Sequence, residues 1–143
     1  MKIAIASTFH PYRGGIAQFN DAMAVALRAD GHMVNCFNWS RQYPSILFPG
    51  VAQTKTGTST PPHSTSAPLD SISPNSWRKT AKIILYDGGV DVVILPFWHS
   101  ALAPALRGVA KSIKRLSPET KVIAIMHNAT SHDGKASEKW LTR

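Results

Sequence analysis

The residues that decide the fold are KIAIAS at 2–7 and FHPYRGGIAQFN at 9–20, a strand pattern followed by a glycine pair and a helix pattern. Similar apolar runs stand at 91–96 (DVVILP) and 121–126 (KVIAIM), and each continues directly into polar or aromatic residues. In an open α/β sheet, ligands bind outside the carboxyl ends of the strands, where loops leave the sheet and helix N-termini point outward. We call this edge of the sheet the rim, and we expect the functional residues there.

The rest of the chain alternates strand and helix patterns. Apolar residues at helical spacing predict a first helix ending near Gly31, and 32–38 (HMVNCFN) predicts a second strand. Two further helices are predicted, one closed by residues 87–89 and one that Ser100 caps and Pro118 stops. The three apolar stripes are Ile16, Phe19, Met23 and Leu27; Trp77, Ala81, Ile84 and Leu85; and Leu102, Leu106, Val109, Ile113 and Leu116.

These repeated strand–helix units predict an α/β fold with a Rossmann-like, doubly wound parallel sheet. Right-handed crossovers place the four expected strands in the order two, one, three, four. They also place the first helix on one face of the sheet and the next two helices on the other face.

Two stretches depart from the alternation. Residues 51–76 contain eleven Ser or Thr and four Pro with few large apolar residues, so we expect a flexible loop there. The last residues, 137–143 (SEKWLTR), look like the opening of another helix, which suggests a fragment. With that helix cut short, apolar sheet surface would be exposed, and we expect self-association into a homo-oligomer or marginal stability.

Length, charge and cysteine content narrow the class of protein. The 143 residues, 43% of them hydrophobic, fit one domain spanning 1–143. A single cysteine, Cys36, and the lack of a signal peptide or membrane-spanning run favour the cytoplasm. The net charge of +8 favours anionic partners, but no nucleic-acid-binding motif is present.

Four motifs together resemble the N-terminal domain of family-four GT-B glycosyltransferases: PYRGGIAQFN at 11–20, SRQYPSILFPG at 40–50, DVVILPFWHS at 91–100 and IAIMHNATSHD at 123–133. The resemblance implies a retaining, metal-independent transfer of a sugar from a nucleotide-sugar to an acceptor. It also implies a cleft against a C-terminal donor-binding domain, and no motif of that domain occurs here. The chain has HNATSHD where many relatives have HNVxPHE, so the loop after Asn128 departs from the family pattern.

The glycine pair is the first candidate site. Gly14 and Gly15 let the backbone approach an anion closely, and the amides of Gly15 and Ile16 at a helix N-terminus favour a phosphate. A tight turn is the simpler interpretation of the same glycines. The resemblance implies contact with the donor diphosphate, and Arg13 would add a charge-assisted contact.

Residues at the ends of later strands are the other candidates. His99 follows Trp98 at a strand end, where the imidazole can bind a sugar hydroxyl, and the resemblance makes it the catalytic residue beside the transferred sugar. His127 and Asn128 suit sugar hydroxyls but also occur as ordinary loop caps. The resemblance assigns both of them, with Trp98, Arg41 and Tyr43, to the acceptor or cleft wall.

Other chemistries are poorly supported by the sequence. The only suggestive pair for carboxylate catalysis is His132 with Asp133, which reads more simply as a solvated loop. No close ligand spacing predicts a metal site. Four cations oppose the stripe of the third predicted helix, and they fit a solvated face better than an acidic membrane surface, though both stay open.

The sequence therefore predicts the acceptor-side domain of a retaining glycosyltransferase, inactive without a donor-binding domain in cis or in trans. Its substrates would be a nucleotide-sugar and a saccharide or lipid-linked acceptor, with no cofactor. Two alternatives stay open: a non-catalytic accessory module and a nucleotide-binding Rossmann domain of another enzyme class.

Overall fold

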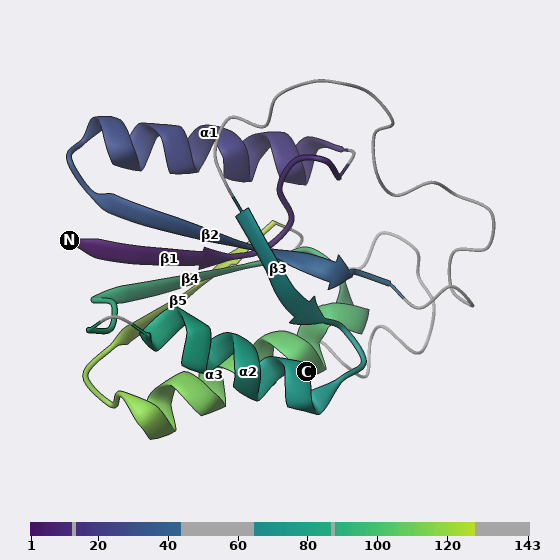
Figure 1. Ribbon diagram of the computed structural model, residues 1–143. Coiled ribbons are helices and arrows are strands. Elements are labelled where there is room, and N and C mark those ends of the chain that lie inside the picture. The colour runs from purple at the N-terminus through teal and green to yellow at the C-terminus, as the bar shows by residue number, and fades with distance from the viewer. Residues whose placement is uncertain (13, 44–64, 87, 128–143) are drawn as a thin grey trace.

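The computed structural model describes residues 1–12, 14–43, 65–86 and 88–127, and it has an α/β architecture with a parallel, Rossmann-like sheet (Figure 1). The elements alternate along the chain as the sequence predicts, with one strand added. They are β1 (Lys2–Ala6), α1 (Gly15–Ala29), β2 (Met33–Arg41), β3 (Thr65–Asp70), α2 (Pro74–Leu85), β4 (Val92–Phe97), the short 3₁₀ helix η1 (Ser100–Leu102), α3 (Ala103–Leu116) and β5 (Lys121–Met126).

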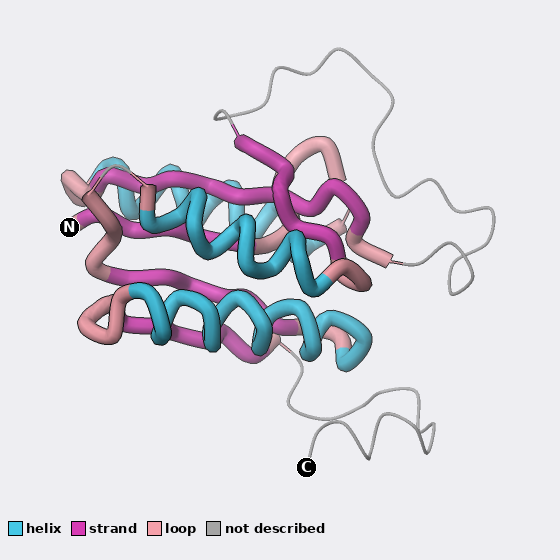
Figure 2. The backbone as a smooth tube through the Cα atoms, turned by 60° about the horizontal axis from the view of Figure 1, so that its bottom comes forward, coloured by secondary structure: helices cyan, strands magenta, loops and turns pink. Residues whose placement is uncertain are grey.

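The sheet topology confirms the predicted order of the four expected strands. The described strands form one sheet in the order β3-β2-β1-β4-β5, and all four neighbouring pairs are parallel. Helix α1 lies on one face, and α2 and α3 lie side by side on the other (Figures 1 and 2). This division follows from right-handed crossovers, which change face when the chain passes back over β1.

The prediction of a loop throughout 51–76 was wrong for its second half. β3 pairs in parallel with β2 from Cys36–Thr65 to Arg41–Asp70, and α2 starts at Pro74 rather than near Trp77. The segment TSAPLD lacks a strand pattern, but as an edge strand it tolerates Pro68, whose missing N–H need not serve a second neighbour. Residues 51–64 lie outside the described residues.

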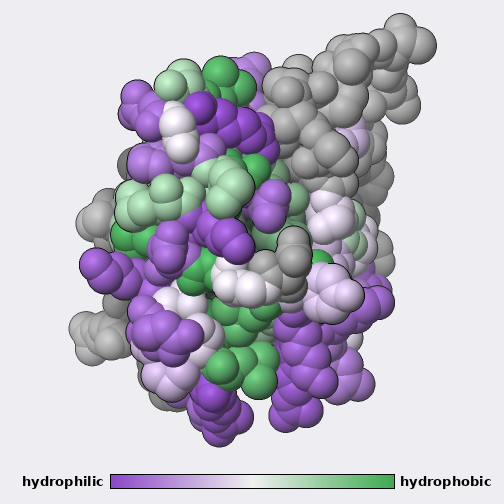
Figure 3. Space-filling model, turned by 60° about the vertical axis from the view of Figure 1, so that its left-hand side comes forward, coloured by the Kyte–Doolittle hydropathy of each residue, from purple (hydrophilic) through white to green (hydrophobic). Residues whose placement is uncertain are grey.

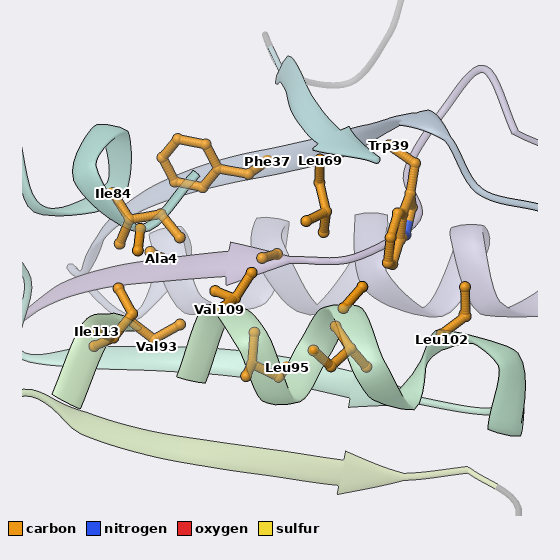
Figure 4. Close-up of a cluster of buried hydrophobic side chains, with 14 of the residues drawn as sticks. Ala4, Phe37, Trp39, Leu69, Ile84, Val93, Leu95, Leu102, Val109 and Ile113 are labelled. Atoms are coloured by element: carbon orange, nitrogen blue, oxygen red, sulfur yellow. The ribbon is translucent and has the colours of Figure 1, made fainter. Parts of the chain in front are cut away.

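The larger hydrophobic core lies between the sheet and α2 and α3. Side chains of Phe37, Trp39, Leu69, Val93 and Leu95 point from the strands toward the apolar faces of the two helices (Figure 4). From the helices come Ile84, Val109 and Ile113, which are at most 2% exposed. The predicted stripes of these helices are thus confirmed, except at Leu116, which is 54% exposed at the end of α3.

The smaller core lies under α1, and here the predicted stripe was partly wrong. The helix buries Ala17, Asn20 and Ala24, whereas Phe19 is 46% exposed. The strands already supply bulky side chains to this face, so small helix residues allow α1 to approach closely. The side-chain NH₂ of the buried Asn20 donates to Ser7 Oγ at 2.8 Å and to the Thr8 carbonyl at 2.9 Å, whereas its Oδ1 has no hydrogen-bond partner among the described residues.

The start of the third predicted helix also differs from the prediction. His99, not Ser100, is the N-cap, because its Nδ1 accepts a hydrogen bond from the backbone N–H of Ala101 at 3.1 Å. Ser100 begins η1, and α3 follows from Ala103. The expected glycine at the end of α1 is confirmed, since Gly31 adopts a φ of 84° that glycine tolerates best.

The outer strand β5 leaves apolar surface uncovered. Ile123 is 47% exposed on the α1 side, which agrees with the predicted exposure of apolar sheet surface there, whereas Met126, 57% exposed, lies on the α3 side. Whether this surface drives self-association stays a prediction. Among the described residues, no helix combines the length and the apolar character that crossing a membrane requires.

Candidate functional site

The rim begins with the loop after β1, which hydrogen bonds hold in place. Asn38 of β2 makes three of these hydrogen bonds. Its Oδ1 accepts from the backbone N–H of Phe9 at 3.2 Å, and its Nδ2 donates to the carbonyls of Phe9 and His10, both at 3.2 Å. Tyr12 Oη donates to the Trp39 carbonyl at 2.9 Å. Burial raises the pKa of Tyr12, so the phenol stays protonated and remains a donor at neutral pH. The loop therefore presents the start of α1 from a fixed base.

The N-terminus of α1 is open where the glycine pair stands. Gly14 is the N-cap with a φ of 111°, a conformation that L side chains rarely adopt, and the helix starts at Gly15. A Cβ placed on either glycine would meet nothing within 4 Å. Position 14 therefore requires glycine because of its backbone angle. The structure leaves space at Gly15 for a ligand, and a side chain there would block that approach without straining the helix.

Three aromatic residues, Tyr43, Trp98 and His99, form what we call the rim cluster. The indole N–H of Trp98 donates to Tyr43 Oη at 2.8 Å, and the rings of Tyr43 and His99 meet edge to face with centroids 5.6 Å apart. Tyr43 follows β2 and the other two follow β4, so the fold unites loops that are more than fifty residues apart. All three side chains are half-buried.

The hydrogen bond at the start of η1 decides what His99 can do. Because Nδ1 accepts from Ala101 N–H, neutral His99 carries its proton on Nε2. In that tautomer, Nε2 is a hydrogen-bond donor rather than a base. A donor at Nε2 is the type of group that suits a hydroxyl or phosphate oxygen.

His127 lies elsewhere on the rim, against α1. Its ring meets the exposed Phe19 ring edge to face at a centroid distance of 4.8 Å, and its backbone N–H donates to the Phe97 carbonyl at 2.9 Å. Within the described part of the chain, its buried Nε2 has no hydrogen-bond partner. A buried polar atom without a partner is costly, so this nitrogen is a candidate contact for a ligand or a further group.

Arg41 is engaged in an ion pair across the edge of the sheet. Its Nη2 and Nε contact the Asp70 carboxylate at 2.5 and 3.0 Å, which joins the ends of β2 and β3. The hydrogen bond from Arg41 is the main reason that the pKa of Asp70 lies below its usual value. The ion pair of Arg41 therefore holds the end of β3 against β2.

The sequence-predicted site residues fall into two groups. Tyr43, Trp98 and His99 pack on the α2–α3 side, whereas the glycine pair and His127 lie on the α1 side. Arg13 and Asn128 lie outside the described residues, as do His132 and Asp133. No group of His, Cys, Asp or Glu within the described ranges could hold a metal ion.

Sequence reasoning missed three residues that shape the rim: Asn20, Asn38 and Phe19. Asn20 and Asn38 are buried amides, and the signal that could have found them is a polar side chain at an otherwise apolar position. Phe19 belongs to the predicted apolar stripe, and only the structure shows that its ring is half exposed and contacts His127. Comparisons of the chain with protein-family models and with curated proteins found no match.

Proposed function

We propose that this chain is the acceptor-side domain of a retaining glycosyltransferase that takes a nucleotide-sugar donor. The observation that carries the proposal is the rim cluster, because Tyr43, Trp98 and His99 converge from two loops at the carboxyl ends of parallel strands. Aromatic rings pack on the apolar faces of sugars, while imidazole and phenol groups bind their hydroxyls. The four-motif resemblance in the sequence adds to this argument.

In the proposed mechanism, the α1 N-terminus binds the donor diphosphate. The amides of Gly15 and Ile16 would donate to phosphate oxygens beside the open Gly14, with Arg13 adding charge. His99 is the catalytic residue in this proposal, donating from Nε2 to the transferred sugar as the bond to the leaving diphosphate breaks.

The acceptor would lie against the other rim residues. His127 and Asn128 would bind it from the α1 side, and Trp98 with Tyr43 from the opposite side. Arg41 would contribute charge at the cleft wall while it keeps its ion pair with Asp70. The reaction would need a donor-binding domain in cis or in trans, so this chain alone would be inactive.

The proposed function also has an expected cellular compartment and an expected cofactor requirement. A single buried thiol, Cys36, agrees with a reducing compartment, and we propose the cytoplasm. The reaction would use no metal ion or cofactor, because helix-terminus amides supply the charge stabilisation at the diphosphate. A saccharide or a lipid-linked acceptor at an acidic membrane surface would both fit a basic chain.

The leading alternative is a nucleotide-binding Rossmann domain of another enzyme class. The open glycine N-terminus of α1 beside β1 favours it, since that is where doubly wound folds bind nucleotide phosphates. It predicts strong nucleotide binding by this chain alone, whereas the glycosyltransferase proposal predicts weak binding that depends on the sugar.

Saturation-transfer NMR with the chain separates the two proposals. The probes are UDP-, GDP- and ADP-glucose and the free nucleotides, tested on the unchanged chain and on Trp98→Ala, His99→Ala and Tyr86→Ala. Tyr86 is the control, because it is an exposed aromatic residue, 82% accessible, beyond the end of α2.

We expect contacts to the glucose ring that Trp98→Ala and His99→Ala remove and Tyr86→Ala keeps. Equal binding of free nucleotides in all variants would favour the alternative. The absence of any glucose contact would contradict the glycosyltransferase proposal. Circular dichroism of each variant checks that the fold is intact.

A further inference from the structure

The two helices on one face of the sheet are strongly basic. Helices α2 and α3 carry seven Lys or Arg side chains and no Asp or Glu, as their sequences PNSWRKTAKIIL and APALRGVAKSIKRL show. On the face that Figure 3 shows, hydrophilic and hydrophobic groups are interspersed, and hydrophilic groups stand on both sides of a hydrophobic group at the bottom of the view. This surface lies away from the rim and is not explained by the proposed function.

A groove runs between α2 and α3, and cations line it from both sides. Its lining residues are Arg78 and Lys82 of α2 with Ser112, Arg115 and Leu116 of α3. On each helix the polar residues lie three or four positions apart, so they share the face that borders the seam. The volume, about 150 Å³, is below the roughly 300–1,000 Å³ typical of pockets for whole drug-sized ligands. The groove suits a single small group.

Close packing of the helices fixes the groove at one end. Gly108 lies against Trp77, and a Cβ on Gly108 would stand only 2.3 Å from the Trp77 ring. One turn further along α3, Ser112 Oγ donates to the Gly108 carbonyl at 2.8 Å, which leaves the hydroxyl oxygen beside the cations. The two helices are therefore held at a set spacing where the groove opens.

The groove cations lack carboxylate partners among the residues that the structure describes. Within the described part of the chain, no ion pair joins Arg78, Lys82 or Arg115 to a carboxylate. Lys114 provides the contrast, because its Nζ donates to the carbonyls of Pro118 and Thr120, both at 2.8 Å. Like charges in one groove repel, and an anion between them would relieve that repulsion.

The helix dipole explains only part of this pattern. Lys82 and Arg115 stand in the last turns of their helices, where cations are favourable. Arg78 stands in the second turn of α2, where the dipole has little effect on a cation. The dipole therefore does not account for the charge at Arg78.

We propose that the groove between α2 and α3 is a second binding site, for the phosphate group of an anionic ligand. Arg78 and Arg115 bind its oxygens from opposite helices, Lys82 adds charge, and Ser112 lines the wall. The same chemistry serves a soluble phosphate ester or a phospholipid headgroup, and Leu116 at the edge of the groove is compatible with both.

The test uses the whole chain and two matched pairs of variants. Arg78→Gln and Arg115→Gln remove groove cations, whereas Lys79→Gln and Lys111→Gln remove exposed cations of the same helices that do not line the groove. Inorganic pyrophosphate is titrated by NMR at constant ionic strength, and the signals of Ser112 and Leu116 are followed so that binding at the groove is separated from binding at the N-terminus of α1. Sedimentation with phosphatidylglycerol and phosphatidylcholine vesicles distinguishes a lipid from a soluble source.

We expect pyrophosphate affinity to fall about tenfold in Arg78→Gln and Arg115→Gln and to change less than about twofold in the two controls. Binding only to phosphatidylglycerol vesicles, lost in the same two variants, supports the site with a lipid source. Equal weakening in all four variants, or no binding to either probe, overturns the proposal. Melting curves without ligand show whether each variant is folded.

Discussion

The two helical layers of this protein cover the same sheet in different ways. On one face, α1 packs through Ala17, Asn20 and Ala24, and Asn20 is fixed by hydrogen bonds to the loop after β1. On the other face, α2 and α3 bury large apolar side chains such as Val109 and Ile113, and their outer surface is basic.

The difference teaches how each layer relates to function. The α1 layer couples a helix directly to the rim, because the residues that pack it also hold the loop before its N-terminus. The α2–α3 layer supplies most of the core, and its charged side chains are exposed on the outside. Substitutions of residues that pack under α1 should therefore disturb the rim. Substitutions of residues that pack under α3 should lower the free energy of unfolding.

The largest expected effect is Ile113→Ala, which removes a fully buried side chain from the α2–α3 core. We expect a loss of about 2–5 kcal/mol in the free energy of unfolding, measured by urea denaturation. Phe19→Ala on α1 should cost only about 1 kcal/mol, because that ring is half exposed. Equal losses would mean that the two layers contribute alike.

The second prediction concerns the thiol beneath α1. Burial raises the pKa of Cys36 from 9.0 to about 11, and the side chain is 4% exposed. The higher pKa alone lowers the thiolate fraction near pH 8 about a hundredfold, since each pKa unit is a factor of ten. Labelling by iodoacetamide should be at least that much slower in the folded chain than in urea. Fast labelling of the folded chain would show that the α1 layer opens readily.

The third prediction compares glycines in the two layers. In Gly108→Ala the new Cβ would stand 2.3 Å from the Trp77 ring, which cannot easily move because its Nε1 donates to the Asp70 carbonyl at 2.7 Å. We expect destabilisation of about 1–3 kcal/mol, despite the better helix propensity of alanine.

Gly15→Ala on α1 is the matched control, since its Cβ meets nothing within 4 Å. Its unfolding free energy should stay within about 0.5 kcal/mol of the unchanged chain. A stabilised Gly108→Ala variant would show that the contact between α2 and α3 is loose.

The smallest effect is expected for the Arg41–Asp70 ion pair at the β3 edge of the sheet. The pKa of Asp70 is lowered, mainly by its hydrogen bond from Arg41, so the carboxylate stabilises the folded chain above its unfolded pKa near 3.8. That stability is lost as the pH falls through the lower, folded pKa. Asp70→Asn should thus be slightly less stable than the unchanged chain at pH 7 and equally stable at strongly acidic pH. A difference that persists in acid would show that the ion pair is not its cause.

Much of the fold could be predicted because it depends on patterns within short segments. Apolar runs such as 91–96 and 121–126 specify strands, of which only the first is buried, and the stripe of α3 specifies its inner face. The strand order then follows from the handedness of crossovers, which is a property of any L-polypeptide. The glycine at the end of α1 was equally readable, because Gly31 has the positive φ that such an end requires.

The candidate site was predictable in its parts but not in its arrangement. That polar residues follow the strands is visible in the sequence, but Tyr43 and His99 meet only because β1 lies between β2 and β4 in the sheet. The pairing of His127 with Phe19 depends likewise on how far α1 reaches across the sheet.

By itself, the sequence determined the alternation of elements, the order of four strands and the faces of α2 and α3, because local periodicity and chain handedness suffice for these. Tertiary structure alone decided that TSAPLD is a strand, that α1 packs through Ala17 and Ala24, and that Arg78 and Arg115 share a groove. The reason is that each of these depends on a partner distant in the chain. An edge strand takes its hydrogen bonds from β2, and a helix turns its small residues toward strands that are already bulky.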